Sequence, residues 1–165
     1  MLDFTLEDLS AEDVERLRTV YRPLTEAVRD LIDATIRSEV DADAVAEAKT
    51  QIDAATATLR SRQLDGPFGV RFTAHGDRMP WGGNAVIGLR NPIAPPLSVQ
   101  RDETGGGCSP TSNSVRPTRG GRRGHVHGGV AAMLLDHILG EVASPATSPR
   151  LTGTITVRYL RPTPR

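Results

Sequence analysis

Residues 125–140 read His-Val-His-Gly-Gly-Val-Ala-Ala-Met-Leu-Leu-Asp-His-Ile-Leu-Gly, and this stretch decides the fold that we expect for the chain. Gly128 and Gly129 allow the backbone to approach a ligand closely and then to enter a helix. The residues that follow are apolar on nearly every side, which predicts a buried central helix over 129–142. Asp136 is the exception to this apolar pattern. Burying an unpaired carboxylate costs several kcal/mol, so Asp136 needs a partner or a function.

The two parts of this predicted helix suit acyl transfer. Free N–H groups and the positive end of the helix dipole near Gly128 form an anion site. Asp136 lies two turns further along, where it can act as a base or a nucleophile. Two plainer readings stay open: Asp136 pairs with an arginine in the core, or His125 and His127 bind a metal. His127 is better explained as fixing the glycine turn through a hydrogen bond.

Other nucleophiles have weaker support in the sequence. No Gly-x-Ser-x-Gly motif occurs, and Cys108 has no base near it in the sequence, so neither a Ser nor a Cys nucleophile is predicted. Cys108 is also the only cysteine, which excludes an internal disulfide and fits a reducing cytosol.

The N-terminal part, residues 10–62, has helical periodicity, with apolar residues three and four positions apart. Ser10 is expected to cap a first helix, and Asp41 or Asp43 a second one. Pro23 predicts a break or a kink near Arg22, with a new helix opening at Pro23. The short connection predicts an antiparallel hairpin. Its apolar stripe either packs on the rest of the domain or serves as a coiled-coil partner surface.

A change of composition at Asp65-Gly66-Pro67 divides the chain into a helical extension, 1–64, and a second domain, 65–165. Short strands are expected at 70–72 and 85–89. Residues 101–124 offer almost nothing to bury, which predicts a disordered loop. Arg116 to Arg123 within it could bind RNA, but no aromatic residue interleaves with the basic ones.

Overall composition excludes several classes of function. The chain has 20 basic and 20 acidic residues and a formal net charge of zero, so no bulk field attracts nucleic acid or a membrane surface. No apolar run approaches the roughly 20 residues that span a membrane. The N-terminus is acidic where a signal peptide is basic. We therefore expect a soluble, cytoplasmic protein.

Two segments together resemble the PaaI-like branch of the hotdog-fold acyl-CoA thioesterases. The first runs from His127 to Gly140, with Asp136 nine residues after the histidine, and the second is the alternating run at 151–162. The resemblance implies an α+β hotdog fold, in which an antiparallel sheet wraps a central helix, here preceded by an N-terminal helical hairpin. It also implies hydrolysis of acyl-CoA to free acid and CoA, as in fatty acid metabolism, in a homodimer or a dimer of dimers.

The resemblance assigns roles to individual residues. Asp136 would act as general base on water or as nucleophile, the N–H of Gly128 would bind the oxyanion, and His127 would shape the turn. Thr152 would help to hold the attacking water across the dimer interface. Substrate contacts are implied for two further residues, Gly129 and Asn91. No metal or redox cofactor is implied, because CoA arrives as part of the substrate.

The sequence departs from this family in two places. Residues 101–124 lack the alternation expected of the strand before the histidine, and the chain ends at Arg165, one predicted strand after the helix. We therefore expect an incomplete, truncated hotdog domain with impaired activity. Two other functions stay open: a non-catalytic acyl-CoA or acyl-carrier binding module, and a helical interaction protein built on 10–62 with a vestigial thioesterase part.

Overall fold

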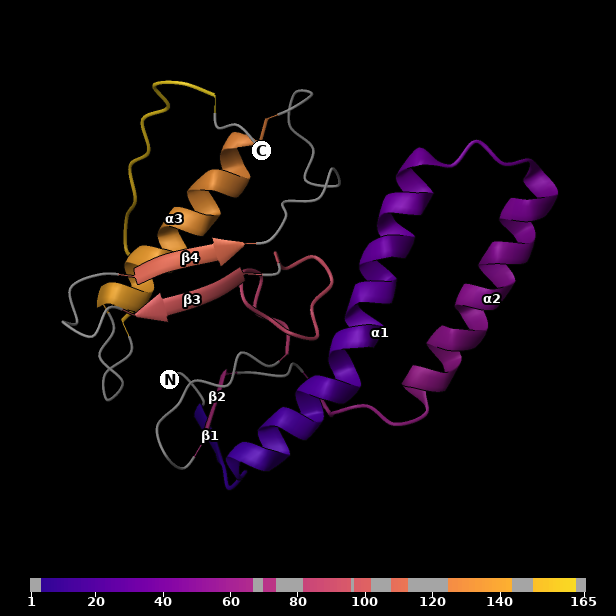
Figure 1. The fold of residues 1–165 in the computed structure, drawn as a ribbon, viewed down its shortest axis with the longest axis horizontal. Coiled ribbons are helices and arrows are strands. Elements are labelled where there is room, and N and C mark those ends of the chain that lie inside the picture. The colour runs from indigo at the N-terminus through magenta and orange to yellow at the C-terminus, as the bar shows by residue number, and fades with distance from the viewer. Residues whose placement is uncertain are drawn as a thin grey trace.

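The computed structural model describes residues 4–66, 70–73, 82–95, 97–101, 108–112, 125–143 and 150–162 of the 165-residue chain. Its helices are α1 (Ala11–Arg37), α2 (Ala42–Arg60) and α3 (Gly128–Ala143), and its strands are β1 (Phe4–Glu7), β2 (Val70–Thr73), β3 (Leu97–Arg101) and β4 (Cys108–Ser112). Figure 1 shows α1 and α2 on one side of the molecule and α3 with β3 and β4 on the other. No helix in the described ranges is long and apolar enough to cross a membrane.

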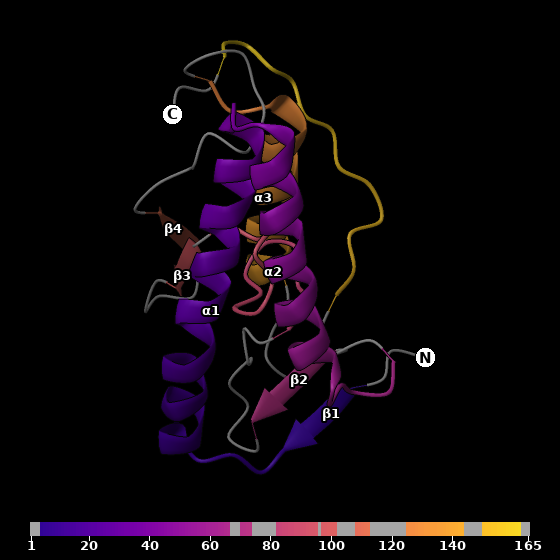
Figure 2. The same cartoon turned by 90° about the vertical axis from the view of Figure 1, so that its right-hand side faces the viewer.

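Local capping fixes where α1 and α2 begin. The Ser10 hydroxyl accepts a hydrogen bond from the N–H of Asp13, and the Asp13 carboxylate accepts one from the N–H of Ser10, which is a capping box. Asp41 caps α2, because its Oδ1 accepts the N–H of Ala44 at 2.9 Å. The two helices run antiparallel (Figure 2), so the predicted caps and hairpin are confirmed.

Of the break or kink predicted near Arg22, the break is wrong, because α1 continues through Pro23 as one helix of 27 residues, and the kink stays a prediction. A proline inside a helix removes one N–H donor, here the donor for the carbonyl of Thr19. The helix persists because its part after Pro23 is anchored elsewhere. Arg29, less than two turns after the proline, is buried against the loop at 82–95.

Two arginines join this loop to α1. The guanidinium of Arg29 donates to three backbone carbonyl oxygens of the loop, those of Asn91 (3.4 Å), Pro92 (3.3 Å) and Ala94 (3.0 Å). In return, Arg90 places its guanidinium 3.5 Å from the ring centroid of Tyr21, a cation–π contact. The loop therefore packs on α1 through contacts that link distant parts of the sequence.

The loop at 82–95 is shaped by its own side chains. Asn84 Oδ1 accepts the N–H groups of Val86 (2.8 Å) and Ile87 (3.0 Å), which bends the chain into a turn. The strand predicted at 85–89 is therefore wrong. Val86 is buried inside the loop, so the apolar residues of this run serve a turn rather than a sheet.

The strands form two separate pairs. β1 pairs in parallel with β2, from Phe4↔Val70 to Glu7↔Thr73, and β3 pairs antiparallel with β4, from Leu97↔Ser112 to Arg101↔Cys108. β2 confirms the strand predicted at 70–72. β4 corrects the prediction of a disordered loop at 101–124 for residues 108–112; residues 102–107 and 113–124 of that prediction lie outside the described residues.

The predicted hotdog fold is wrong for the chain that the structure describes. The helices of 27, 19 and 16 residues dominate, the strands have four or five residues, and no sheet in the described ranges wraps α3. Segment 150–162 is extended, but it forms no strand ladder with described residues. Alternating residues predict an extended backbone, whereas a sheet also needs a partner strand in register.

The helix predicted at 129–142 is confirmed as α3, but its predicted burial on all sides is wrong. α3 lies against β4 on one side. On another side Leu135, Leu139 and Val142 are exposed. These three residues are four and three positions apart, so they form one apolar face of the helix.

Candidate active site

His127 caps α3 at the glycine pair. Its carbonyl oxygen accepts the N–H groups of Val130 (2.9 Å) and Ala131 (3.1 Å). Its ring Nδ1 accepts the N–H of Gly129 at 3.1 Å. Because Nδ1 is the acceptor, that atom carries no proton in this arrangement. The Gly129 N–H, one of the free donors of the first helical turn, is therefore satisfied within the chain.

Gly128 is held from the C-terminal segment by Tyr159. The Tyr159 hydroxyl donates to the carbonyl oxygen of Gly128 at 2.8 Å, across 31 positions of sequence. A Cβ at Gly128 would lie 3.2 Å from two atoms of the Tyr159 ring, so this position favours glycine. The N–H of Gly128 donates to no residue that the structure describes. The Gly128 carbonyl is thus fixed by the C-terminal segment.

Asp136 lies on the same helix, about 12 Å from Gly128 along the axis at 1.5 Å per residue. Its Oδ1 is buried and accepts no hydrogen bond from any described residue. No described arginine forms an ion pair with Asp136, so the reading of a paired core carboxylate has no support in these ranges. An unsatisfied buried acceptor costs about 1–3 kcal/mol.

Further along α3, a histidine and a glutamate lie one turn apart. His137 Nε2 is 3.8 Å from Glu141 Oε1, and the two side chains are only 12% and 8% exposed. Their spacing of four residues on a helix is readable from the sequence, although their burial is not. No three metal-ligating side chains gather within the described parts of the chain, and His125 and His127 have no third such neighbour there.

Asn91, for which a substrate contact was expected, serves the loop in this structure. Its Nδ2 donates to the carbonyl oxygens of Gly83 (3.3 Å) and Asn84 (3.2 Å), and its Oδ1 accepts the N–H of Ile93 (3.0 Å). These bonds use both ends of the amide. Asn91 therefore stabilises the loop that Arg29 anchors on α1.

The structure brings together only some of the predicted site residues. His127, Gly128 and Gly129 meet at the start of α3, and Asp136 follows on the same helix. Thr152 is exposed in the extended segment and forms no hydrogen bond with described residues. Sequence reasoning missed Tyr159 as a site residue; it belongs to the alternating segment, but its contact with Gly128 is not visible in a sequence pattern.

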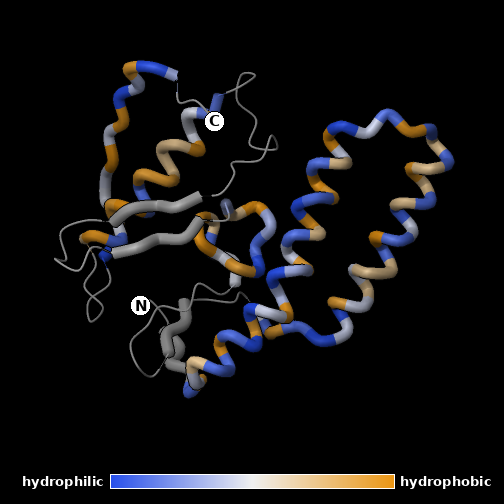
Figure 3. The backbone as a smooth tube through the Cα atoms, in the orientation of Figure 1, coloured by the Kyte–Doolittle hydropathy of each residue, from blue (hydrophilic) through white to orange (hydrophobic). Residues whose placement is uncertain are grey.

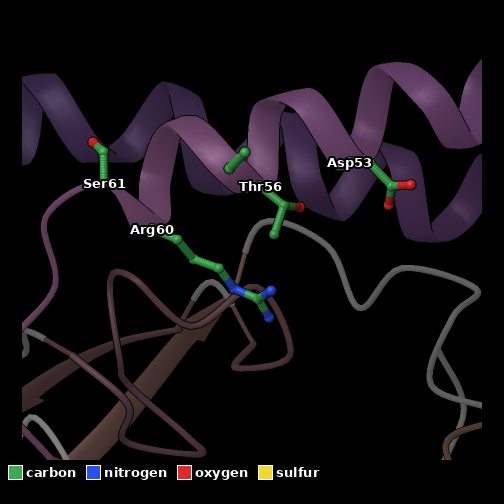
Figure 4. A pocket seen from close by; sticks show the side chains of 5 residues that line it. Asp53, Thr56, Arg60 and Ser61 are labelled. Carbon is green, nitrogen blue, oxygen red and sulfur yellow. The ribbon is translucent and has the colours of Figure 1, made fainter.

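A separate hollow of about 460 Å³ lies on α2, lined by Asp53, Thr56, Ala57, Arg60 and Ser61 (Figure 4). These residues recur every three or four positions, so the hollow follows one face of a single helix. In Figure 1, α1 stands between α2 and α3. The hollow is thus remote from the carboxylate and the glycine turn of α3.

Comparison with known proteins finds similarity among solved structures. No protein-family model matches the sequence, and no curated protein matches it. Among solved structures, the crystal structure of a "thioesterase superfamily protein" is similar, with a TM-score of 0.70 and 25% sequence identity. The match covers 98% of this chain and 77% of the other. The chain is thus similar, over nearly its whole length, to a thioesterase superfamily protein, and this likeness supports a thioesterase at the level of the superfamily.

Proposed function

We propose that this chain hydrolyses acyl-CoA thioesters, with Asp136 as general base on water or as nucleophile. The observation that carries the proposal is the buried Oδ1 of Asp136, which has no hydrogen-bond partner among the described residues. The likeness to a thioesterase superfamily protein supports this class of reaction. The arrangement of the glycine pair and Asp136 on one helix supports its PaaI-like form, with a homodimer or a dimer of dimers as the working unit.

In this proposal the N–H of Gly128 stabilises the oxyanion that forms on the thioester carbonyl. That N–H lies at the positive end of α3, and donors aimed at developing negative charge lower the barrier to acyl transfer. Tyr159 holds the adjacent peptide, between Gly128 and Gly129, through the Gly128 carbonyl. Gly129 does not supply a donor, because its N–H is bonded to His127. Its lack of a side chain instead lets the substrate approach the backbone closely.

One copy of the chain cannot bring both groups to one carbonyl. Gly128 and Asp136 are about 12 Å apart along α3, whereas reacting groups must come within about 3–3.5 Å of each other. We therefore infer that Gly128 of one copy works with Asp136 of a second copy. The exposed face of Leu135, Leu139 and Val142 on α3 is consistent with such a neighbour. Thr152 is assigned to holding the attacking water.

The first experiment measures release of CoA from a panel of acyl-CoA thioesters. Asp136→Asn keeps the shape of the side chain but cannot take up the proton or attack. We expect the hydrolysis rate to fall about 10²–10⁴-fold. Calorimetric binding of acyl-CoA and the circular dichroism spectrum should remain as in the unmutated chain. Hydrolysis by Asp136→Asn at the unmutated rate contradicts the assignment, and binding without turnover in the unmutated chain favours a binding module.

The second experiment tests the two-copy site. Gly128→Pro removes the N–H at the first helical position, where proline is tolerated. Gly128→Ala is the matched control, because it adds a Cβ against Tyr159 but keeps the N–H. Mixing inactive Gly128→Pro with inactive Asp136→Asn chains should restore up to roughly a quarter of the activity through mixed dimers with one intact site. No recovery on mixing would contradict the two-copy site.

A further inference from the structure

α2 presents an apolar stripe that the rest of the chain leaves uncovered. None of its 19 residues is buried. Val45, Ile52 and Leu59 are 55%, 38% and 51% exposed. They are seven residues apart, so they lie along one line of the helix, as in a coiled-coil seam. The alternation of apolar and polar residues along α2 is visible in Figure 3. For α2, the expectation that the apolar stripe of the hairpin packs on the rest of the domain is therefore wrong.

The stripe is symmetric about its centre. Val45 and Leu59 each lie seven residues from Ile52. Just outside the two ends of the helix, the exposed residues Val40 and Leu64 each lie twelve residues from it. A two-fold axis through Ile52 therefore superposes large apolar residues on large apolar residues when a second α2 runs antiparallel. Isologous contacts of this kind, in which the same patch serves both subunits, are the commonest way for identical chains to associate.

The charges along α2 select the same antiparallel direction. Its N-terminal end and the chain just before it are acidic, with Glu39, Asp41, Asp43 and Glu47, and its C-terminal end and the chain just after it are basic, with Arg60 and Arg62. Arg60 extends from the helix in Figure 4. An antiparallel second copy brings acidic and basic ends together, which favours association, whereas a parallel copy places like charges side by side.

We propose that α2 is a self-association surface, on which the α2 helices of two copies of this chain pack antiparallel with Ile52 at the two-fold axis. Ala48 and Ala55 lie between the large residues of the stripe and allow the two helices to approach closely. In Figure 1, α1 stands between α2 and α3, so this contact does not involve α3. The proposal stands independently of the thioesterase reaction.

The central test is Ile52→Glu, with mass measured by sedimentation over a range of concentrations. The substitution removes a buried apolar side chain from both copies and brings two carboxylates together. We expect the dissociation constant of this contact to rise at least about 100-fold. Thr50→Glu is the matched control, since it adds the same charge to an exposed position on the opposite side of α2. The proposal is overturned if Ile52→Glu and Thr50→Glu associate equally. It is also overturned if Ile52→Glu associates as tightly as the unmutated chain, or if the unmutated chain does not associate.

A charge exchange tests the direction of packing. One variant carries Asp43→Lys and Glu47→Lys, and the other carries Arg60→Glu and Arg62→Glu. Each alone should associate more weakly than the unmutated chain, and an equimolar mixture should recover association as a mixed pair. In a parallel pair like charges already meet, so the single variants would be no weaker than the unmutated chain. That result, or no recovery on mixing, rejects the antiparallel contact; circular dichroism verifies that each variant keeps α2 folded.

Discussion

The helical hairpin and the loop that packs on it are stabilised over different distances along the chain. Along α1 and α2, caps and ion pairs connect residues three or four positions apart, as in the pair Lys49–Asp53. The loop at 82–95 is joined to α1 by Arg29, which reaches the carbonyl oxygen of Ala94 across 65 positions. Local bonds determine that a helix forms, whereas distant ones determine which surface of that helix is buried.

This difference predicts unequal responses to substitution. Exposed ion pairs within one helix contribute about 0–1 kcal/mol each, because water and salt screen them. A buried guanidinium bonded to several carbonyl oxygens contributes more, since removing it leaves those acceptors without donors. The following substitutions test the contrast, from the largest expected effect to the smallest.

Arg29→Met should give the largest loss of stability. The substitution removes three bonds to loop carbonyls and the ion pair with Glu26, all at a buried position. We expect the free energy of unfolding to fall by about 3 kcal/mol. Urea titration followed by circular dichroism measures it. Arg16→Met, which removes an exposed pair with Asp13, is the control and should cost less than about 1 kcal/mol. Similar losses for both arginines would remove the distinction between the two regions.

Gly88→Ala should destabilise the loop itself. A Cβ at Gly88 would lie 2.4 Å from the carbonyl oxygen of Gly82 and 2.5 Å from that of Asn84, so backbone must shift. Overpacking of this kind costs about 1–3 kcal/mol, measured again by urea titration. Gly83→Ala is a control in the same loop, since nothing lies within 4 Å of its added Cβ. A loss at Gly83 as large as that at Gly88 would contradict the packing described for the loop.

The same contrast explains what the sequence could predict about the fold. The caps at Ser10 and Asp41 were predictable because each bond spans three residues. Helix α1 continues through Pro23, which could not be foreseen, because the anchoring partner of Arg29 lies more than 60 residues away. β4 was missed since Cys-Ser-Pro-Thr-Ser has no apolar alternation, and its pairing with β3 creates the strand. The hotdog sheet was inferred from a family resemblance, because the sequence pattern does not show which strands pair with each other.

The candidate site divides in the same way. The glycine pair, its histidine cap and Asp136 lie within ten residues, and a helical repeat is enough to place them on one element. The burial of the Asp136 carboxylate oxygen depends on segments elsewhere in the chain. So does the bond that holds Gly128, which comes from Tyr159. Asn91 illustrates the limit, since its bonds to Gly83 and Ile93 are not visible in the sequence, and its contact with substrate stays a prediction.

Tyr159→Phe should have a moderate effect at the start of α3. It removes the hydroxyl bonded to the Gly128 carbonyl but keeps the ring, so we expect a loss of about 1 kcal/mol in unfolding free energy. Tyr21→Phe is the control, because it makes the same chemical change at a ring that contacts Arg90 through its face. If Tyr21→Phe lowers the free energy of unfolding as much as Tyr159→Phe does, the hydrogen bond to Gly128 does not contribute to stability.

The smallest expected effect concerns pH and the start of α1. Hydrogen bonds from the side chain and then the backbone of Ser10 hold the pKa of Asp13 below its ordinary value of 3.8. Because the folded value is the lower one, the charged carboxylate stabilises the folded state above pH 3.8, and this contribution is lost as the pH falls through the folded value. Acid should therefore weaken the unmutated chain slightly more than it weakens Asp13→Asn, which does not titrate there.

A double-mutant comparison isolates this effect from the other carboxylates of the chain. The urea midpoint is measured from neutral pH to below 3.8 for the unmutated chain, Asp13→Asn, Ser10→Ala and the double variant. The difference in pH dependence between Asp and Asn at position 13 should be present with Ser10 and smaller with Ser10→Ala, since Ser10 supplies the bonds that lower the pKa. An equal difference in both backgrounds would mean that the capping box does not set the pKa of Asp13. The capping box at the start of α1 would then contribute less to the free energy of unfolding than we expect.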